Sequence, residues 1–170
     1  MKEEFVMFAK YLQDKNEKFG VLLDKLSNAE REKDRGSYYK SASGLFRHII
    51  GTPAFFAGMI QGALADGAPA KTVAFPNFEY LEGEITEAQW KQVREVTAKI
   101  DAAFLDLVSK LRNEDLQTKA KWFSGDMVPI YFVLHSLIAH QIHHQGALSQ
   151  ILDELKIDND LSGINVGFMG

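Results

Sequence analysis

Length, composition and charge place this chain among ordinary globular domains and exclude several chemistries. With 170 residues, 46% of them hydrophobic, it can bury a substantial core, and we expect a single domain over residues 1–170. It contains no cysteine, which excludes disulfides, thiolate ligands and a cysteine nucleophile. The net charge of −4 is spread along the chain without the basic stripe that neutralises phosphates, so we predict no nucleic-acid partner.

The first residues and the hydropathy pattern argue against export and membrane insertion. Residues 1–10 carry lysines and glutamates and lack the apolar run of a signal peptide. No window of the sequence approaches the ~20 apolar residues that a membrane span needs. We therefore expect a cytoplasmic protein with no membrane partner.

Two amphipathic segments occupy the first part of the chain. In residues 5–26 apolar side chains recur at three- and four-residue steps, which predicts a helix of roughly seven turns. The charged run 30–36 is interpreted as a solvated connection. Residues 41–65 place a second apolar stripe on one face, with Pro53 inside it. Because proline lacks an N–H, we expect a kink or a break there, with Thr52 capping a restarted helix.

Residues 66–85 form the least regular stretch, rich in glycine and proline. A connection of this length is long for a compact domain. Apolar side chains along it indicate that it packs on the rest of the protein. We interpret it as a crossover along a helical bundle, with a lid over a pocket as the functional alternative.

Two further helical segments follow. Residues 86–89 fit a capping box, and a clean apolar stripe continues from there to residue 111. After a second connection at 113–126, Asp126 is expected to cap a helix that reaches residue 155. The tail 158–170 is predicted to be non-helical, and no strand pattern is evident. Four such helices predict an all-α, four-helix bundle with a long crossover between helices two and three.

The histidines carry the strongest functional signal. His140 and His144 lie four residues apart, so on a helix both project from one face, about 6 Å apart along the axis. His48 lies in the apolar stripe of the second helix, and we expect all three to point inward. Imidazoles at this spacing can converge on one divalent ion, and a buried imidazole without partners costs on the order of 1–3 kcal/mol. The predicted metal ligands are His48, His140 and His144; hydrogen-bonded core histidines are the alternative.

The two remaining histidines fall outside this set. His143 lies about 100° around the helix from His144, which suggests a supporting or interfacial role. His135 is off the apolar stripe, and we assign it to the surface or to a structural role.

The sequence HQIHHQG at 140–146, together with SGLFRHII at 43–50, resembles the DinB-like superfamily of damage-inducible proteins, which includes bacterial low-molecular-weight-thiol transferases. The resemblance covers nearly the whole chain and implies a helical bundle with a crossover, often a homodimer, holding nickel or zinc on the three histidines. Gln145 and Ala147 depart from the residues common in the family, where arginine and glutamine are frequent. Neither position is a ligand, so the departures bear on substrate chemistry.

Three functions are compatible with such a site. The first is a metal-dependent transferase or hydrolase that activates a small thiol or water; any thiol must be a cosubstrate, because the chain has no cysteine. The second is a non-catalytic, stress-related metal-binding or structural dimer protein. The third is general-base hydrolysis by Glu79, Glu82 or Glu84 of the long connection. The sequence leaves open whether His143, Gln145 or residues 66–85 contribute to the site.

Overall fold

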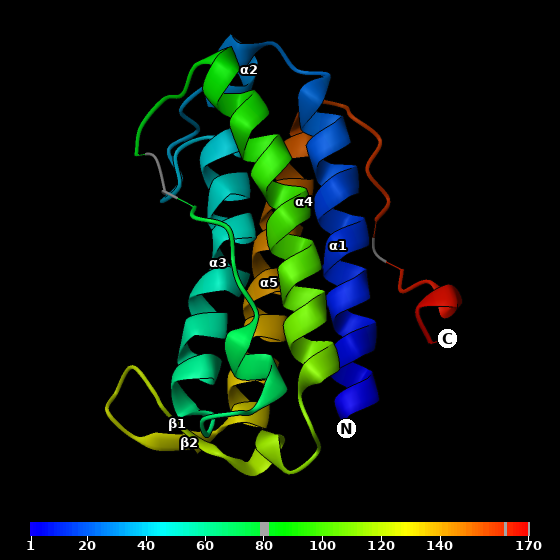
Figure 1. Ribbon diagram of the computed structural model, residues 1–170. Coiled ribbons are helices and arrows are strands. Elements are labelled where there is room, and N and C mark those ends of the chain that lie inside the picture. The colour runs from blue at the N-terminus through cyan, green and yellow to red at the C-terminus, as the bar shows by residue number, and fades with distance from the viewer. Residues whose placement is uncertain (79–81, 162, 170) are drawn as a thin grey trace.

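The computed structural model describes residues 1–78, 82–161 and 163–169 of the chain. Four long helices lie side by side, namely α1 (Lys2–Asp24), α3 (Ala42–Ala63), α4 (Glu87–Lys110) and α5 (Ile130–Glu154) (Figure 1). Helices α1 and α5 run in one direction, and α3 and α4 run in the other (Figure 1). The predicted all-α fold class is confirmed. Within the described residues, no helix is both long and apolar enough to cross a membrane.

The crossover is required by this topology. Because α3 and α4 are parallel, the chain must return along the whole length of the helices between them, and it does so after the short 3-10 helix η1 (Pro69–Thr72) (Figure 1). Helix α4 then begins with the predicted capping box, in which the Thr86 hydroxyl accepts from the Gln89 amide and the Gln89 side chain accepts from the Thr86 amide.

A short hairpin precedes α5 and corrects two predictions. Strands β1 (Lys119–Lys121) and β2 (Met127–Pro129) pair antiparallel, although no strand was expected. Three-residue strands are too short to show a two-residue periodicity, but Gly125, with a φ of 92°, marks the turn between them. Asp126 lies in this turn rather than capping a helix, and α5 begins after Pro129, whose side chain offers no cap.

The charged connection after α1 is also different from the prediction. It contains the helix α2 (Asn28–Glu32), in which Arg31 is 1% exposed. The Arg31 guanidinium lies over the Trp90 ring and donates to the carbonyls of Leu23 and Leu26, and it pairs with Glu87. The residue is buried because it caps the C-terminal carbonyls of α1, a role that charge composition does not reveal. Two further short 3-10 helices are η2 (Asp115–Gln117) and, in the tail expected to be non-helical, η3 (Val166–Met169).

Helix α3 continues through Pro53, so the expected break and restarted helix are wrong. The Thr52 hydroxyl donates to the carbonyl of His48 at 2.7 Å instead of capping a new helix. The carbonyl of Ile49, which loses its helical donor to Pro53, accepts from Nε2 of Gln141 on α5 at 2.9 Å. The neighbouring helix therefore satisfies the group that would otherwise favour a break.

A polar layer divides the hydrophobic core into two clusters. One cluster surrounds Phe56, Phe104 and Leu137, and the other surrounds Phe46, Trp90 and Leu148. The buried polar side chains between them include Asn16, Thr52, Thr97, Asp101, Gln141 and Gln145. Hydrogen bonds tie α1 to α4 through Asn16 and Asp101, α1 to α5 through Tyr11 and Gln145, and α5 to α3 through Gln141 and Ile49. Since each bond has one geometry, this layer fixes the axial register of the four helices.

Candidate metal centre

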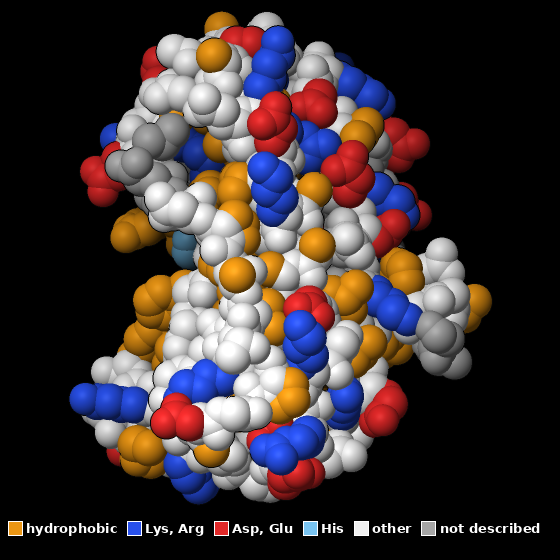
Figure 2. Space-filling model, viewed as in Figure 1, with side chains coloured by type: hydrophobic (Ala, Val, Ile, Leu, Met, Phe, Trp, Pro, Cys, Tyr) orange, Lys and Arg blue, Asp and Glu red, His pale blue; other side chains and the backbone are white. Residues whose placement is uncertain are grey.

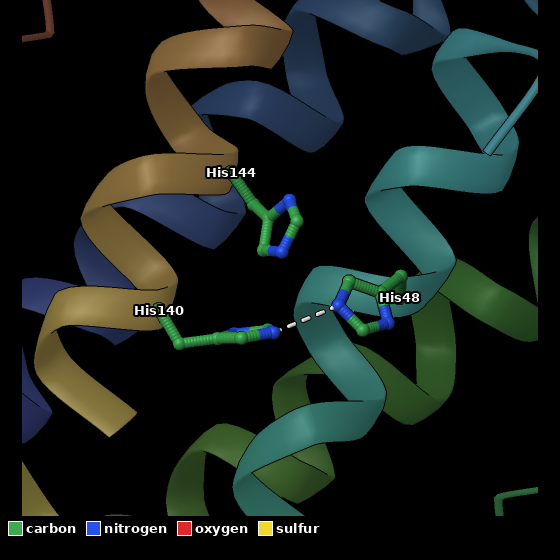
Figure 3. A group of neighbouring side chains, drawn as sticks. All are labelled: His48, His140 and His144. Atoms are coloured by element: carbon green, nitrogen blue, oxygen red, sulfur yellow. Dashed lines mark hydrogen bonds between the residues drawn. The ribbon is translucent and has the colours of Figure 1, made fainter. Parts of the chain in front are cut away.

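Three histidines from two helices converge in the polar layer. His48 projects from α3, and His140 and His144 project from successive turns of α5, so that the rings turn toward a common point (Figure 3). One nitrogen of each ring lies within 4.8 Å of the corresponding nitrogens of the other two. The Nε2 atoms of His48 and His140 are 2.9 Å apart. The predicted meeting of the three imidazoles is therefore present.

The histidines lie at the edge of the core stripe rather than in its centre, contrary to the prediction that they point inward. The fully buried positions on α5 at this level are Gln141 and Gln145, whereas His140 and His144 are half-buried. His48 is half-buried as well. Because glutamine is polar, the hydropathy pattern did not indicate that positions 141 and 145 are buried. His48 and His140 border cavities at the protein surface, where small molecules can reach them.

The electrostatics of the cluster keep the imidazoles neutral. Burial, and then the neighbouring rings of His140 and His144, lower the pKa of His48 to about 4. Burial, followed by His140 and His143, lowers the pKa of His144 to about 4, and burial lowers the pKa of His140 in the same direction. Neutral imidazole is the form that binds a metal ion.

Sequence reasoning missed Tyr39, which forms one wall of the site. Its ring stacks on His48 with centroids 4.2 Å apart and meets His144 edge-on at 5.3 Å. Gly44 makes this placement possible, since a Cβ there would lie 2.2 Å from the Tyr39 carbonyl oxygen. Ser41 caps α3 by accepting from the Gly44 amide at 3.0 Å. The adjacent pair Tyr38–Tyr39, just before an N-cap serine, was the available signal.

The other candidate residues lie outside the cluster. His143 is exposed, with its ring 4.8 Å from that of His144, and His135 is exposed and donates from Nδ1 to the Tyr131 carbonyl. Gln145 is buried and accepts from the Tyr11 hydroxyl, so it joins α1 to α5. Glu82 and Glu84 line a cavity beside His48 but do not belong to the ligand cluster; Glu79 lies outside the described residues.

Two cavities adjoin the histidines. One, of about 580 Å³, carries acidic and basic side chains and includes Tyr39 and His48 in its lining. The other, of about 510 Å³, is lined mainly by phenylalanines and includes both His48 and His140. Figure 2 shows a hollow at the left edge of the molecule, with apolar side chains above and below it and a histidine side chain visible within. His48 thus lies between a polar space and an apolar one.

The donor set fits a divalent metal ion. Three neutral imidazoles are the ligands that zinc, nickel and similar ions prefer, and no carboxylate of the described residues joins them. In addition, Nδ1 of His140 is buried and has no hydrogen-bond partner among the described residues. Two ring nitrogens, the Nε2 atoms of His48 and His140, face each other at 2.9 Å, and a cation shared between them would satisfy both.

The comparisons with known proteins bear on the family and the fold. The DinB family matches residues 1–155, and the chain belongs to this family. A solved structure of a DinB-like protein from Bacillus subtilis is similar over 89% of this chain and 93% of that one, with a TM-score of 0.61 and 16% sequence identity. At that identity the likeness concerns the fold alone. No curated protein matches the sequence.

Proposed function

We propose that this protein is a metal-dependent transferase that acts on a small thiol at His48, His140 and His144. The observation that carries the proposal is the convergence of three neutral imidazoles, of which His48 lines two open cavities and His140 lines one of them. A zinc or nickel ion held there would lower the pKa of a thiol or water at its open position. The chain has no cysteine, so the thiol must be a second substrate.

The surroundings of the histidines favour transfer over hydrolysis. Among the described residues no carboxylate belongs to the ligand cluster, and Glu82 and Glu84 line only the polar cavity beside His48. Two separate cavities share His48, which suits a reaction between two different molecules. In such a transfer, the thiol proton passes to solvent, a C–S bond forms, and the leaving group departs with the electron pair of its former bond. A low-molecular-weight thiol as cosubstrate fits the cytoplasm, where thiols are kept reduced.

Turnover with a thiol panel tests the proposal directly. Tag-free protein is loaded with zinc or nickel and offered bacterial low-molecular-weight thiols with an aromatic electrophile, and thioether formation is followed by absorbance. We expect turnover that His48→Ala loses by at least about a hundredfold, because the variant lacks one ligand. His135→Ala, an exposed histidine on α5, should retain it.

Two outcomes contradict this function. Equal rates for the unaltered protein and His48→Ala across the panel would show that the histidines do not act on thiols. A large loss of stability on chelation, without any turnover, would favour the non-catalytic, structural role of the metal. We also propose a homodimer, from the family resemblance, which sedimentation equilibrium of the tag-free protein tests.

A further inference from the structure

The apolar cavity beside His48 and His140 has the character of a binding site for a ring. Building on the proposed function, we propose that it receives the neutral aromatic portion of the second substrate, the electrophile, and holds its reactive atom at the histidine end. Four phenylalanines from three segments line it: Phe55 and Phe56 from α3, Phe78 from the crossover, and Phe123 from the loop between β1 and β2. Its volume, about 510 Å³, lies within the ~300–1,000 Å³ of small-molecule pockets.

Two of these rings stack on each other and remain exposed. Phe55 is 57% exposed and Phe123 is 63% exposed, although burying such a side chain is worth roughly 1.5–3 kcal/mol. Their planes are only 4° apart, with centroids separated by 5.8 Å. A flat ring entering beside them would gain offset-stacked contact and cover apolar surface that now faces water.

The position of Phe78 in the cavity lining depends on Gly51. A Cβ at Gly51 would lie 2.7 Å from the ring of Phe78, so the absence of a side chain there lets the crossover approach α3. Phe78 consequently lines the same cavity as His48. The long connection thus supplies part of the proposed substrate site.

The polar groups of the cavity select against an anionic ligand. Its one arginine, Arg47, is 2% exposed, donates to the Gly83 carbonyl at 2.8 Å and lies 3.6 Å from Glu32. The Thr52 hydroxyl is engaged with the His48 carbonyl. A charged substituent would therefore lose its hydration without gaining an open partner, whereas a neutral ring loses little.

Nuclear magnetic resonance tests this site independently of turnover. The probe is 4-nitrotoluene, which is neutral and offers no metal ligand of note, added to metal-free and zinc-loaded protein. We expect a saturable shift of the Trp122 indole N–H, because its ring lies 4.6 Å from that of Phe123. The Trp90 indole, 1% exposed in the other core cluster, should not move.

Matched variants and a charged analogue of the probe test whether the phenylalanines bind the ring. Phe55→Ala and Phe123→Ala should each weaken binding at least about fivefold, whereas Ile142→Ala, also exposed, should leave it unchanged. The anion 4-nitrobenzoate should bind the metal-free protein, in which its carboxylate has no metal to coordinate, at least about fivefold more weakly. A missing shift, equal binding of the anion, or substitutions that change only the self-association of the chain would each overturn the proposal. Ring binding without turnover would instead contradict the thiol-transferase function alone.

A second, independent inference concerns Gln141. Pro53 cannot donate to the Ile49 carbonyl, and Nε2 of Gln141, a residue with 0% exposure, does so at 2.9 Å. Ile49 follows His48 on α3, and Gln141 follows His140 on α5. Because the Ile49 carbonyl can only accept a hydrogen bond, the side-chain amide of Gln141 must point its nitrogen, Nε2, toward it. We infer that Gln141 is a positioning residue, which uses the acceptor freed by Pro53 to hold His48 and His140 at metal-binding distance.

A double-mutant cycle tests this inference on the folded protein. Gln141→Leu should weaken zinc binding about tenfold, measured by competition with a chromophoric chelator. In the Pro53→Ala background the amide of residue 53 can donate to the Ile49 carbonyl. There, Gln141→Leu should weaken zinc binding less than about threefold. Gln145→Leu is the matched control, because Gln145 is a buried glutamine that binds Tyr11 of α1.

The outcomes separate positioning from mere stabilisation. A structural role alone predicts that Gln141→Leu and Gln145→Leu both lower the melting temperature and leave the zinc affinity of the folded protein unchanged. That result, or an equal loss of affinity in both backgrounds, would overturn the inference. Gln141→Met, closer in volume and also without the donor, repeats the test if the leucine variant does not fold.

Discussion

Replacing His48 with alanine is expected to weaken the binding of zinc or nickel by at least about a hundredfold, because losing a residue that merely orients a ligand already costs ~10–100-fold. The ion would lose its only ligand from α3 in the described cluster. Titration calorimetry of tag-free protein measures the loss. At a metal concentration of 100 times the dissociation constant, bound metal adds about 2.7 kcal/mol to the free energy of unfolding. For the variant, at the same concentration, the gain falls to about 0.4 kcal/mol.

His143→Ala provides the matched control, since His143 lies beside His144 but is exposed and outside the ligand cluster. It should bind metal within about threefold of the unaltered protein, as expected for an exposed residue that is not a ligand. Equal weakening by both substitutions would show that the cluster does not hold the ion. The same pair of variants distinguishes specific binding from adsorption of metal to surface histidines.

The contribution of Asp101 to the free energy of unfolding is expected to fall as the pH rises from about 4 to about 7, whereas the lowered pKa values of His48 and His144 act in the opposite direction. Burial, opposed by the hydrogen bond from Asn16, raises its pKa from 3.8 to about 7, with Glu17 raising it further and Arg94 lowering it. The folded state therefore holds the proton more tightly than the unfolded state. The stabilisation is fully present below about pH 4 and is lost by about pH 7, an effect of at most ~4 kcal/mol.

Asp101→Asn isolates this effect. The new amide oxygen can still accept from Nδ2 of Asn16, which now donates to the carboxylate at 2.8 Å, but it carries no charge. In urea unfolding the variant should be more stable than the unaltered protein by on the order of 2 kcal/mol at pH 8, with little difference at pH 4. Asp106→Asn, an exposed position on the same helix, should show no such pH dependence. If Asp101→Asn and the unaltered protein differ in stability by the same amount at pH 4 and pH 8, the pH dependence does not come from Asp101.

The sequence by itself determined the helical class, the long crossover and the placement of His140 and His144 on one helix face. These features follow from periodicity: a stripe repeating every three or four residues fixes which side chains share a face, and a four-residue spacing fixes the His140–His144 pair. The capping box at Thr86 is equally local, since its partners lie within one turn. Each of these inferences needs only neighbouring residues along a helix.

Only the tertiary structure decided how the helices are held in register and what surrounds the site. Arg31 and Gln141 look like surface residues in sequence, yet each is buried among partners from distant segments. Arg31 contacts Trp90 and Glu87, and Gln141 donates to the Ile49 carbonyl. In sequence Tyr39 looks like an ordinary loop tyrosine. Only the structure shows that Gly44 leaves room for the chain at Tyr39, whose ring stacks on His48. Backbone acceptors and ring contacts leave no pattern in the sequence, because any residue type can supply the carbonyl and the partner lies far away along the chain.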